Sequence, residues 1–343
     1  MAVVVWHSRP PQSLGIFTMF FAVPLFFFTS GYFYKPSKTI KELRTFYIKR
    51  IKGLYIPFVK WSLVFLVLHN VCFHLNLYNG QYGFRGATSE LYSWTDFAKK
   101  AFNIVFRMSD NEQLLGAFWF IRALFFAALM VATIQFIFRR WNFVNRYAMF
   151  LVLLMLSPIA IHFNINLPWI GNLGLILFSA TFYVFGYCYR KFENDKCYSK
   201  PAMFLSTFIT FLGLVYFDHV VGVLGMKARY LFPYTAVAIS GIFMVLNISK
   251  LMEHTPITKF FYYAGNNTMI ILALHFICLK LGNLIKITVY GWPIERLAEF
   301  PVIEENNQYW WVLYTIVGVS IPLLLQLGYD NIKFNIEKIS RND

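Results

Sequence analysis

Charged residues are scarce in this sequence of 343 residues: aspartate, glutamate, lysine and arginine together make up 14%. Soluble globular domains carry about 25%. Hydrophobic residues make up 58%, and long runs of them recur from Ser13 to Tyr329. This composition excludes an ordinary soluble domain and predicts a chain that crosses a lipid bilayer several times.

Cysteine is also sparse, and the four cysteines form no CxxC pair and have no neighbouring histidines at metal-ligand spacing. We therefore predict neither a disulfide framework nor a metal site. The four residues are expected to be apolar filler within the membrane protein: Cys72, Cys188, Cys197 and Cys278.

Three catalytic signatures are missing as well. The sequence has no glycine-rich phosphate loop, no GxSxG nucleophile elbow and no pair of carboxylates within an apolar run. These absences disfavour nucleotide hydrolysis and glycosidase chemistry.

The apolar runs predict an all-α fold, a polytopic bundle of about ten transmembrane helices in a single domain over residues 1–343. A helix needs about 20 residues to cross the hydrocarbon core. Nine windows meet or approach that length, and the short run at 1–8 would supply an incomplete tenth helix. The nine windows lie near residues 14–34, 54–73, 115–137, 147–163, 172–189, 201–217, 230–249, 260–281 and 309–329.

The formal net charge of +15 is concentrated in short loops between these windows, which is typical of topology signals and not of nucleic-acid binding. When alternate loops are assigned to opposite sides, one side carries about twice as many lysines and arginines as the other. That side is predicted to be cytoplasmic, provided that residues 1–8 belong to a crossing with His7 near its outer end. Since Ala2 to Trp6 span only about 8 Å as helix, we expect Met1 to be a truncated or misplaced start, with roughly 10–15 residues missing upstream.

Ionisable groups inside a bilayer are costly, so they mark candidate functional positions. His7 follows an apolar run and precedes Ser8 and two prolines, where a neutral imidazole could accept the proton of an attacking hydroxyl. An interfacial histidine that bonds with a backbone carbonyl is the other interpretation.

Two more candidates lie deeper in their windows. Arg122, in "AFWFIRALFF", could stack on Trp119 or pair with a phosphate or carboxylate, or it could hold two helices together. His275, in "GNNTMIILALHF", lies about 15 Å of helix rise beyond Gly265, near the middle of the membrane. It could hold substrate, assist proton movement or make an interhelical hydrogen bond.

A basic stretch, "FYIKRIKGLYIPF", runs into the second window. Its Lys49, Arg50 and Lys52 could meet the pyrophosphate and 3′-phosphate of a nucleotide-like acyl carrier, but ordinary topology anchoring explains the same charges.

The order of five segments adds information that no single one carries: "VVVWHS", "PLFFFTSGYF", "YIKRIKGLYIPF", "FWFIRALFF" and "FYYAGNNTMIILALHF". In this order they resemble the membrane-bound acyltransferase-3 family, particularly its branch similar to fucose O-acetylases. The resemblance implies transfer of an acyl group, usually acetyl from acetyl-CoA, to a sugar hydroxyl. It implies that His7 is the catalytic histidine and that Arg50 helps to hold the acyl donor, and it places Trp119 and His275 at recurrent positions.

The sequence thus predicts a plasma-membrane, multi-pass O-acetyltransferase with acetyl-CoA as cosubstrate, no tightly bound cofactor and a cell-surface sugar or polysaccharide as acceptor. Lys49 and Lys52 would assist Arg50, and Arg122 would position polar groups in the cavity. A transporter or flippase of lipid-linked sugars is the main alternative, although the related halves common in transporters are not apparent. A non-catalytic sensor or scaffold is a third possibility.

Overall fold

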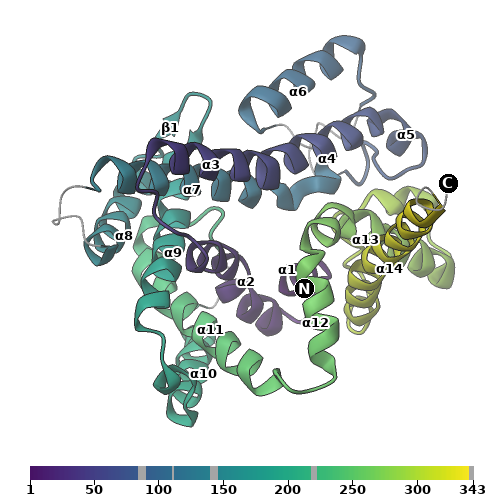
Figure 1. Ribbon diagram of the computed structural model, residues 1–343. Helices are drawn as coiled ribbons and strands as arrows, with labels where there is room; N and C mark the ends of the chain where they lie inside the picture. The colour runs from purple at the N-terminus through teal and green to yellow at the C-terminus, as the bar shows by residue number, and fades with distance from the viewer. Residues whose placement is uncertain (84–89, 110–111, 140–145, 218–221, 340–343) are drawn as a thin grey trace.

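The computed structural model describes residues 1–83, 90–109, 112–139, 146–217 and 222–339, and most of these residues are helical (Figure 1). The first half contains α1 (Ala2–His7), α2 (Gln12–Tyr32), α3 (Ile40–Arg50), α4 (Ile56–Val67), α5 (His69–His74), α6 (Trp94–Arg107), α7 (Trp119–Ile137) and α8 (Arg146–His162). The second half contains α9 (Leu173–Phe192), α10 (Lys200–Tyr216), α11 (Leu231–Met252), α12 (Ile257–Asn266), α13 (Thr268–Tyr290) and α14 (Trp310–Ile339). Between α8 and α9, β1 (Asn166–Leu167) pairs antiparallel with β2 (Gly171–Asn172).

Six described segments are long and apolar enough to cross a membrane: Gln12–Tyr32, Gln113–Ile137, Leu173–Phe192, Ala228–Met252, Thr268–Tyr290 and Trp310–Asn335. The protein is therefore a multi-pass, almost entirely α-helical membrane protein. The expected count of about ten crossings is not confirmed, because the apolar helices α8 and α10 have only 17 residues each.

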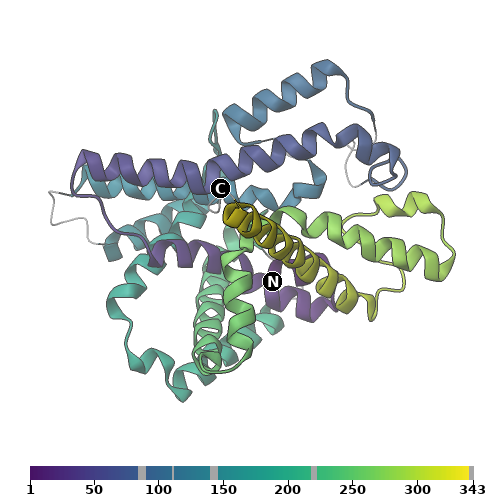
Figure 2. The same ribbon diagram turned by 45° about the vertical axis from the view of Figure 1, so that its right-hand side comes forward.

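The window predicted at 54–73 corresponds to two helices and is not one of these six segments. A π-helical turn, Ile51–Tyr55, joins α3 to α4, so that the two form one long rod (Figure 2). Pro57 has no N–H to donate to the carbonyl of Gly53, which is a physical reason for a wider turn just before it. The apolar part, α4, ends at Val67, and α5 continues from His69.

The window predicted at 260–281 is wrong at its boundary, because a helix break at Asn267 separates α12 from α13. The Asn267 side chain donates to the carbonyl of Tyr263 at 2.9 Å. Asparagine competes with helical hydrogen bonding in this way and often marks helix ends. The crossing therefore begins at Thr268 and extends to Tyr290.

Two glycines let α2 and α9 pack backbone against backbone. A Cβ added at Gly31 would lie 1.7 Å from the carbonyl oxygen of Tyr183, and one added at Gly186 would lie 2.0 Å from that of Phe28. Small residues permit this approach between membrane helices. Most of α9 is buried, and it packs against α2, α7 and α8.

The short helix α1 lies in the middle of the molecule, where it contacts α2 and α14 (Figure 1). Its carboxyl end is held by the segment that precedes α14. The Asn307 side chain donates to the carbonyls of Ser8 and Arg9, at 3.1 and 2.7 Å, and Arg9 pairs with Glu304 at 2.8 Å. These contacts fix the direction of His7, the last residue of α1.

Candidate active site

The structure brings together two of the predicted residues that lie 268 positions apart in the chain. The Nδ1 atom of His7 lies 3.0 Å from Nε2 of His275, and the two rings meet edge to edge, with their centroids 5.2 Å apart and an angle of 17° between their planes. His275 is completely buried in α13, whereas His7 is partly exposed. The pair therefore has one fully enclosed residue and one that retains partial exposure.

Backbone carbonyls hold the inner ring of this histidine pair. Nδ1 of His275 lies 2.9 Å from the carbonyl oxygen of Leu272 and 3.1 Å from that of Ile271. Both carbonyls belong to the preceding turn of α13, so the helix itself orients the ring. The interhelical hydrogen bond considered for His275 is present, and its partner is His7.

Aromatic rings cover one side of the pair. The Phe276 ring lies 4.5 Å from the ring of His7 and 4.1 Å from that of His275, and the Phe300 ring packs on Phe276 at 4.6 Å. A Cβ added at Gly116 would lie 3.6 Å from Phe276. The segment before α7 therefore packs closely against the aromatic cover of the two histidines.

The pair lies less deep in α13 than expected from Gly265. His275 is seven residues beyond Thr268, the first residue of α13, which corresponds to about 10 Å of helix rise. The break at Asn267 accounts for the difference, since the predicted distance of about 15 Å assumed a helix continuous from Gly265.

A second candidate site is a basic cavity of about 740 Å³ between the end of α2 and the start of the α3–α4 rod. This volume is in the range of small-molecule sites. The predicted residues Lys49 and Arg50 line it, and Lys52 does not; Lys52 is exposed in the π-helical turn. The other residues of the basic cavity are Phe33, Tyr34, Lys35, Pro36, Ser37, Lys41, Glu42, Thr45 and Phe46.

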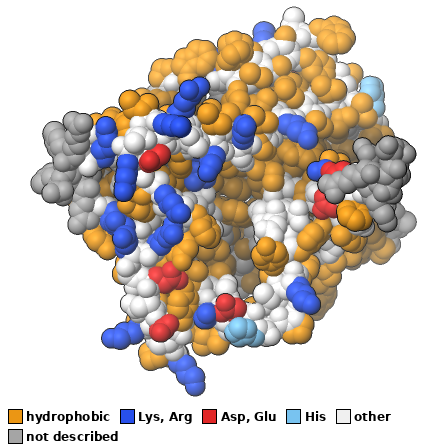
Figure 3. Space-filling view, in the orientation of Figure 1, with side chains coloured by type: hydrophobic (Ala, Val, Ile, Leu, Met, Phe, Trp, Pro, Cys, Tyr) orange, Lys and Arg blue, Asp and Glu red, His pale blue; other side chains and the backbone are white. Residues whose placement is uncertain are grey.

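Four of these side chains are cationic and one is acidic, so the basic cavity favours anions. Figure 3 shows lysine and arginine side chains gathered over α3 and the neighbouring part of the molecule, beside a central hollow. The Arg50 guanidinium lies over the Phe46 ring at 4.9 Å and donates to the hydroxyl of Tyr183 at 3.3 Å. These contacts orient Arg50 at the wall of the cavity.

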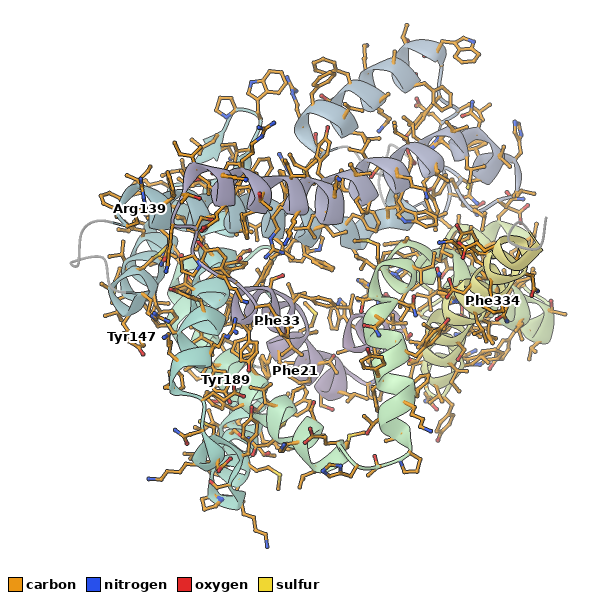
Figure 4. The ribbon with its side chains drawn as sticks, in the orientation of Figure 1. Phe21, Phe33, Arg139, Tyr147, Tyr189 and Phe334 are labelled. Atoms are coloured by element: carbon orange, nitrogen blue, oxygen red, sulfur yellow. The ribbon has the colours of Figure 1, made fainter. Side chains whose placement is uncertain are left out.

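Tyr34 is a residue of this cavity that the sequence interpretation missed. It follows Phe33, which Figure 4 labels near the end of α2, and only 2% of its surface is exposed. Its hydroxyl is buried and has no hydrogen-bond partner among the described residues. A tyrosine hydroxyl is protonated at neutral pH, and burial raises the pKa of Tyr34 further, so this hydroxyl is a hydrogen-bond donor. The residue stands directly after "PLFFFTSGYF", at the end of the window predicted at 14–34, and it was not among the predicted site residues.

Trp119 and Arg122 line a third cavity, of about 250 Å³, together with Ser109 and Asn172. Arg122 donates to the Trp169 carbonyl at 3.5 Å, and an added Cβ at Gly171 would meet its guanidinium at 2.9 Å. Arg122 lies in the first turn of α7, nearer the helix end than expected, because residues 113–118 form a separate 3₁₀ segment. The residues that line this cavity and the basic cavity include neither His7 nor His275.

Comparison with known proteins decides the family. The sequence model described as "Acyltransferase domain", of the acyltransferase-3 family, matches residues 1–327. The chain belongs to the acyltransferase-3 family. No curated protein and no solved structure matches it.

The family match covers the candidate residues of all three sites. The match spans all the candidate residues, from His7 to His275. Family membership favours acyl transfer over the alternative of sugar transport. The roles of His7, Arg50, Lys49, Lys52, Trp119, Arg122 and His275 stay predictions.

Proposed function

We propose that this acyltransferase transfers an acetyl group from acetyl-CoA to a hydroxyl of a cell-surface sugar or polysaccharide, at the plasma membrane. The main support is the pairing of a partly exposed histidine, His7, with a fully buried one, His275. A histidine in such a place can act as a general base, which contributes about 10²–10⁴ to the rate.

In this proposal, His7 accepts the proton of the acceptor hydroxyl while the hydroxyl oxygen attacks the carbonyl carbon of the thioester. The new ester C–O bond forms, the C–S bond breaks and the proton passes from His7 to the leaving thiolate of CoA. The products are the acetylated sugar and free CoA, so the protein returns to its starting protonation state. No tightly bound cofactor takes part.

The basic cavity is the proposed site of the donor's phosphate groups. Arg50 and Lys49 are joined there by Lys35 and Lys41, and charge-assisted hydrogen bonds to phosphate are the strong kind. Lys52, which lies outside the cavity lining, would contribute only through its longer-range charge. The cavity around Trp119 and Arg122 is the proposed place for another part of the acceptor.

The test uses the purified protein reconstituted in liposomes with radiolabelled acetyl-CoA and extracted surface glycan. Wild-type protein should acetylate the glycan, and His7→Ala should reduce the rate to background. Lys52→Ala is the control, because Lys52 is exposed and does not line the basic cavity, and it should retain most of the activity. Undiminished acetylation by His7→Ala would refute the catalytic assignment, and glycan movement across the membrane without acetylation would favour the transporter.

A further inference from the structure

We infer that His275 is a positioning residue that fixes the tautomer of His7, so that the hydrogen of neutral His7 is on Nδ1 and its Nε2 is the proton acceptor. This inference rests on the proposed function of His7. It assigns a specific nitrogen atom to the base and a chemical role to the buried partner.

The argument begins at the backbone. The carbonyl oxygens of Ile271 and Leu272 can only accept hydrogen bonds, and Nδ1 of His275 lies 3.1 and 2.9 Å from them. Nδ1 of His275 must therefore carry a hydrogen. In a neutral imidazole, the other nitrogen is then an acceptor.

The second step passes this assignment to His7. Because Nε2 of His275 is an acceptor, the hydrogen in its 3.0 Å contact with His7 must come from Nδ1 of His7. His7 then has no hydrogen on Nε2 while it is neutral. Among the residues that the structure describes, none makes a hydrogen bond with Nε2 of His7, so this atom is available to a substrate hydroxyl.

Burial makes the arrangement rigid. His275 is 0% exposed, and Phe276 packs against both rings, at 4.1 and 4.5 Å. Water is therefore excluded from the inner ring, and an alternative hydrogen bond to solvent cannot replace the carbonyl contacts. When His7 takes a proton on Nε2, its Nδ1–H becomes a stronger donor to His275, so the pair also stabilises the charged form.

Two substitutions at one position separate this role from simple packing. His275→Gln keeps a carbonyl oxygen that can accept from Nδ1–H of His7, whereas His275→Met fills a similar volume without a comparable acceptor. We expect His275→Met to lower kcat for acetyl transfer by about 10–100-fold, with the KM for acetyl-CoA within about twofold of wild type. His275→Gln should recover most of the lost kcat. Equal losses in the two variants would overturn the inference.

Nitrogen-15 NMR of histidine-labelled protein tests the tautomer without turnover. The His7 signals are identified by their absence from His7→Ala. We expect a protonated Nδ1 and an unprotonated Nε2 in wild type and in His275→Gln, and a shift toward protonated Nε2 in His275→Met. A protonated Nε2 in neutral wild-type His7 would overturn the inference. If instead the tautomer is as expected but His7→Ala acetylates normally, the proposed catalytic role of His7 is refuted. The tautomer assignment of the histidine pair then still holds.

Discussion

The close contact between α2 and α9 gives a quantitative prediction for Gly31→Ala. A Cβ at this position would lie 1.7 Å from the carbonyl oxygen of Tyr183 and 2.6 Å from its carbonyl carbon. Both atoms are backbone, so no side-chain rotation can relieve the clash. The two helices must separate by about 2 Å to restore ordinary contact.

Overpacking of this kind costs typically about 1–3 kcal/mol. We expect at least this loss for Gly31→Ala, because most of α9 is buried against several neighbours and cannot move alone. The displacement would also move Tyr183, whose hydroxyl accepts the 3.3 Å hydrogen bond from Arg50. The substitution should therefore weaken CoA binding as well as lower stability.

The assay is thermal unfolding of the purified variant in one detergent, with and without CoA. Gly328→Ala is the control, since an added Cβ there meets nothing within 4 Å in the interior of α14. Alanine has the higher helix propensity, so the control should be as stable as wild type or slightly more stable. A Gly31→Ala midpoint equal to that of the control would refute the close packing of α2 and α9.

Three further predictions concern the basic cavity and a buried contact between a histidine and a glutamate. In steady-state kinetics, Arg50→Gln should raise the KM for acetyl-CoA about tenfold or more, whereas Lys52→Gln should change it less than threefold. Equal effects of the two substitutions would contradict the assignment of the basic cavity as the donor site. Tyr34→Phe should leave the thermal midpoint of the ligand-free protein unchanged or higher, because a buried hydroxyl without a hydrogen-bond partner is costly. The same substitution should weaken CoA binding several-fold, as measured by calorimetry. Unchanged affinity would mean that the hydroxyl does not contact the donor. The Nδ1 atom of His69 lies 2.9 Å from a carboxylate oxygen of Glu112, and both side chains are buried. His69→Leu would leave the buried carboxylate without this partner and should cost about 3–5 kcal/mol in denaturant unfolding, and the double variant with Glu112→Leu should recover part of that loss. Unchanged stability in His69→Leu would show that the contact is not formed.

Several features of the site could be found from the sequence because they depend on local composition. The apolar windows predicted a multi-pass α-helical protein, since crossing a bilayer requires about 20 apolar residues whatever they pack against. Charge inside or beside such windows identified His7, Arg122, His275 and Arg50 as candidates.

Helix boundaries were less predictable, because they depend on individual hydrogen bonds. The break at Asn267 has no strong hydropathy signal, and it results from a side chain that bonds with the carbonyl of Tyr263. The π-helical turn before Pro57 and the 3₁₀ segment before Trp119 are also local features, each five or six residues long. Hydropathy averages over about 20 residues and cannot resolve such local events.

The sequence by itself determined that this chain enters a membrane, that it resembles an acyltransferase and that His7 and His275 stand out from their apolar surroundings. Only the tertiary structure decided that these two histidines touch, because their contact joins residues 268 positions apart through the packing of α1 on α14, which in turn packs on α13. The same is true of Tyr34 and Arg50, which line one cavity between the segment that follows α2 and the helix α3. Local composition shows that a polar residue is costly to place in the membrane. The packing of the helices determines which residue becomes its partner.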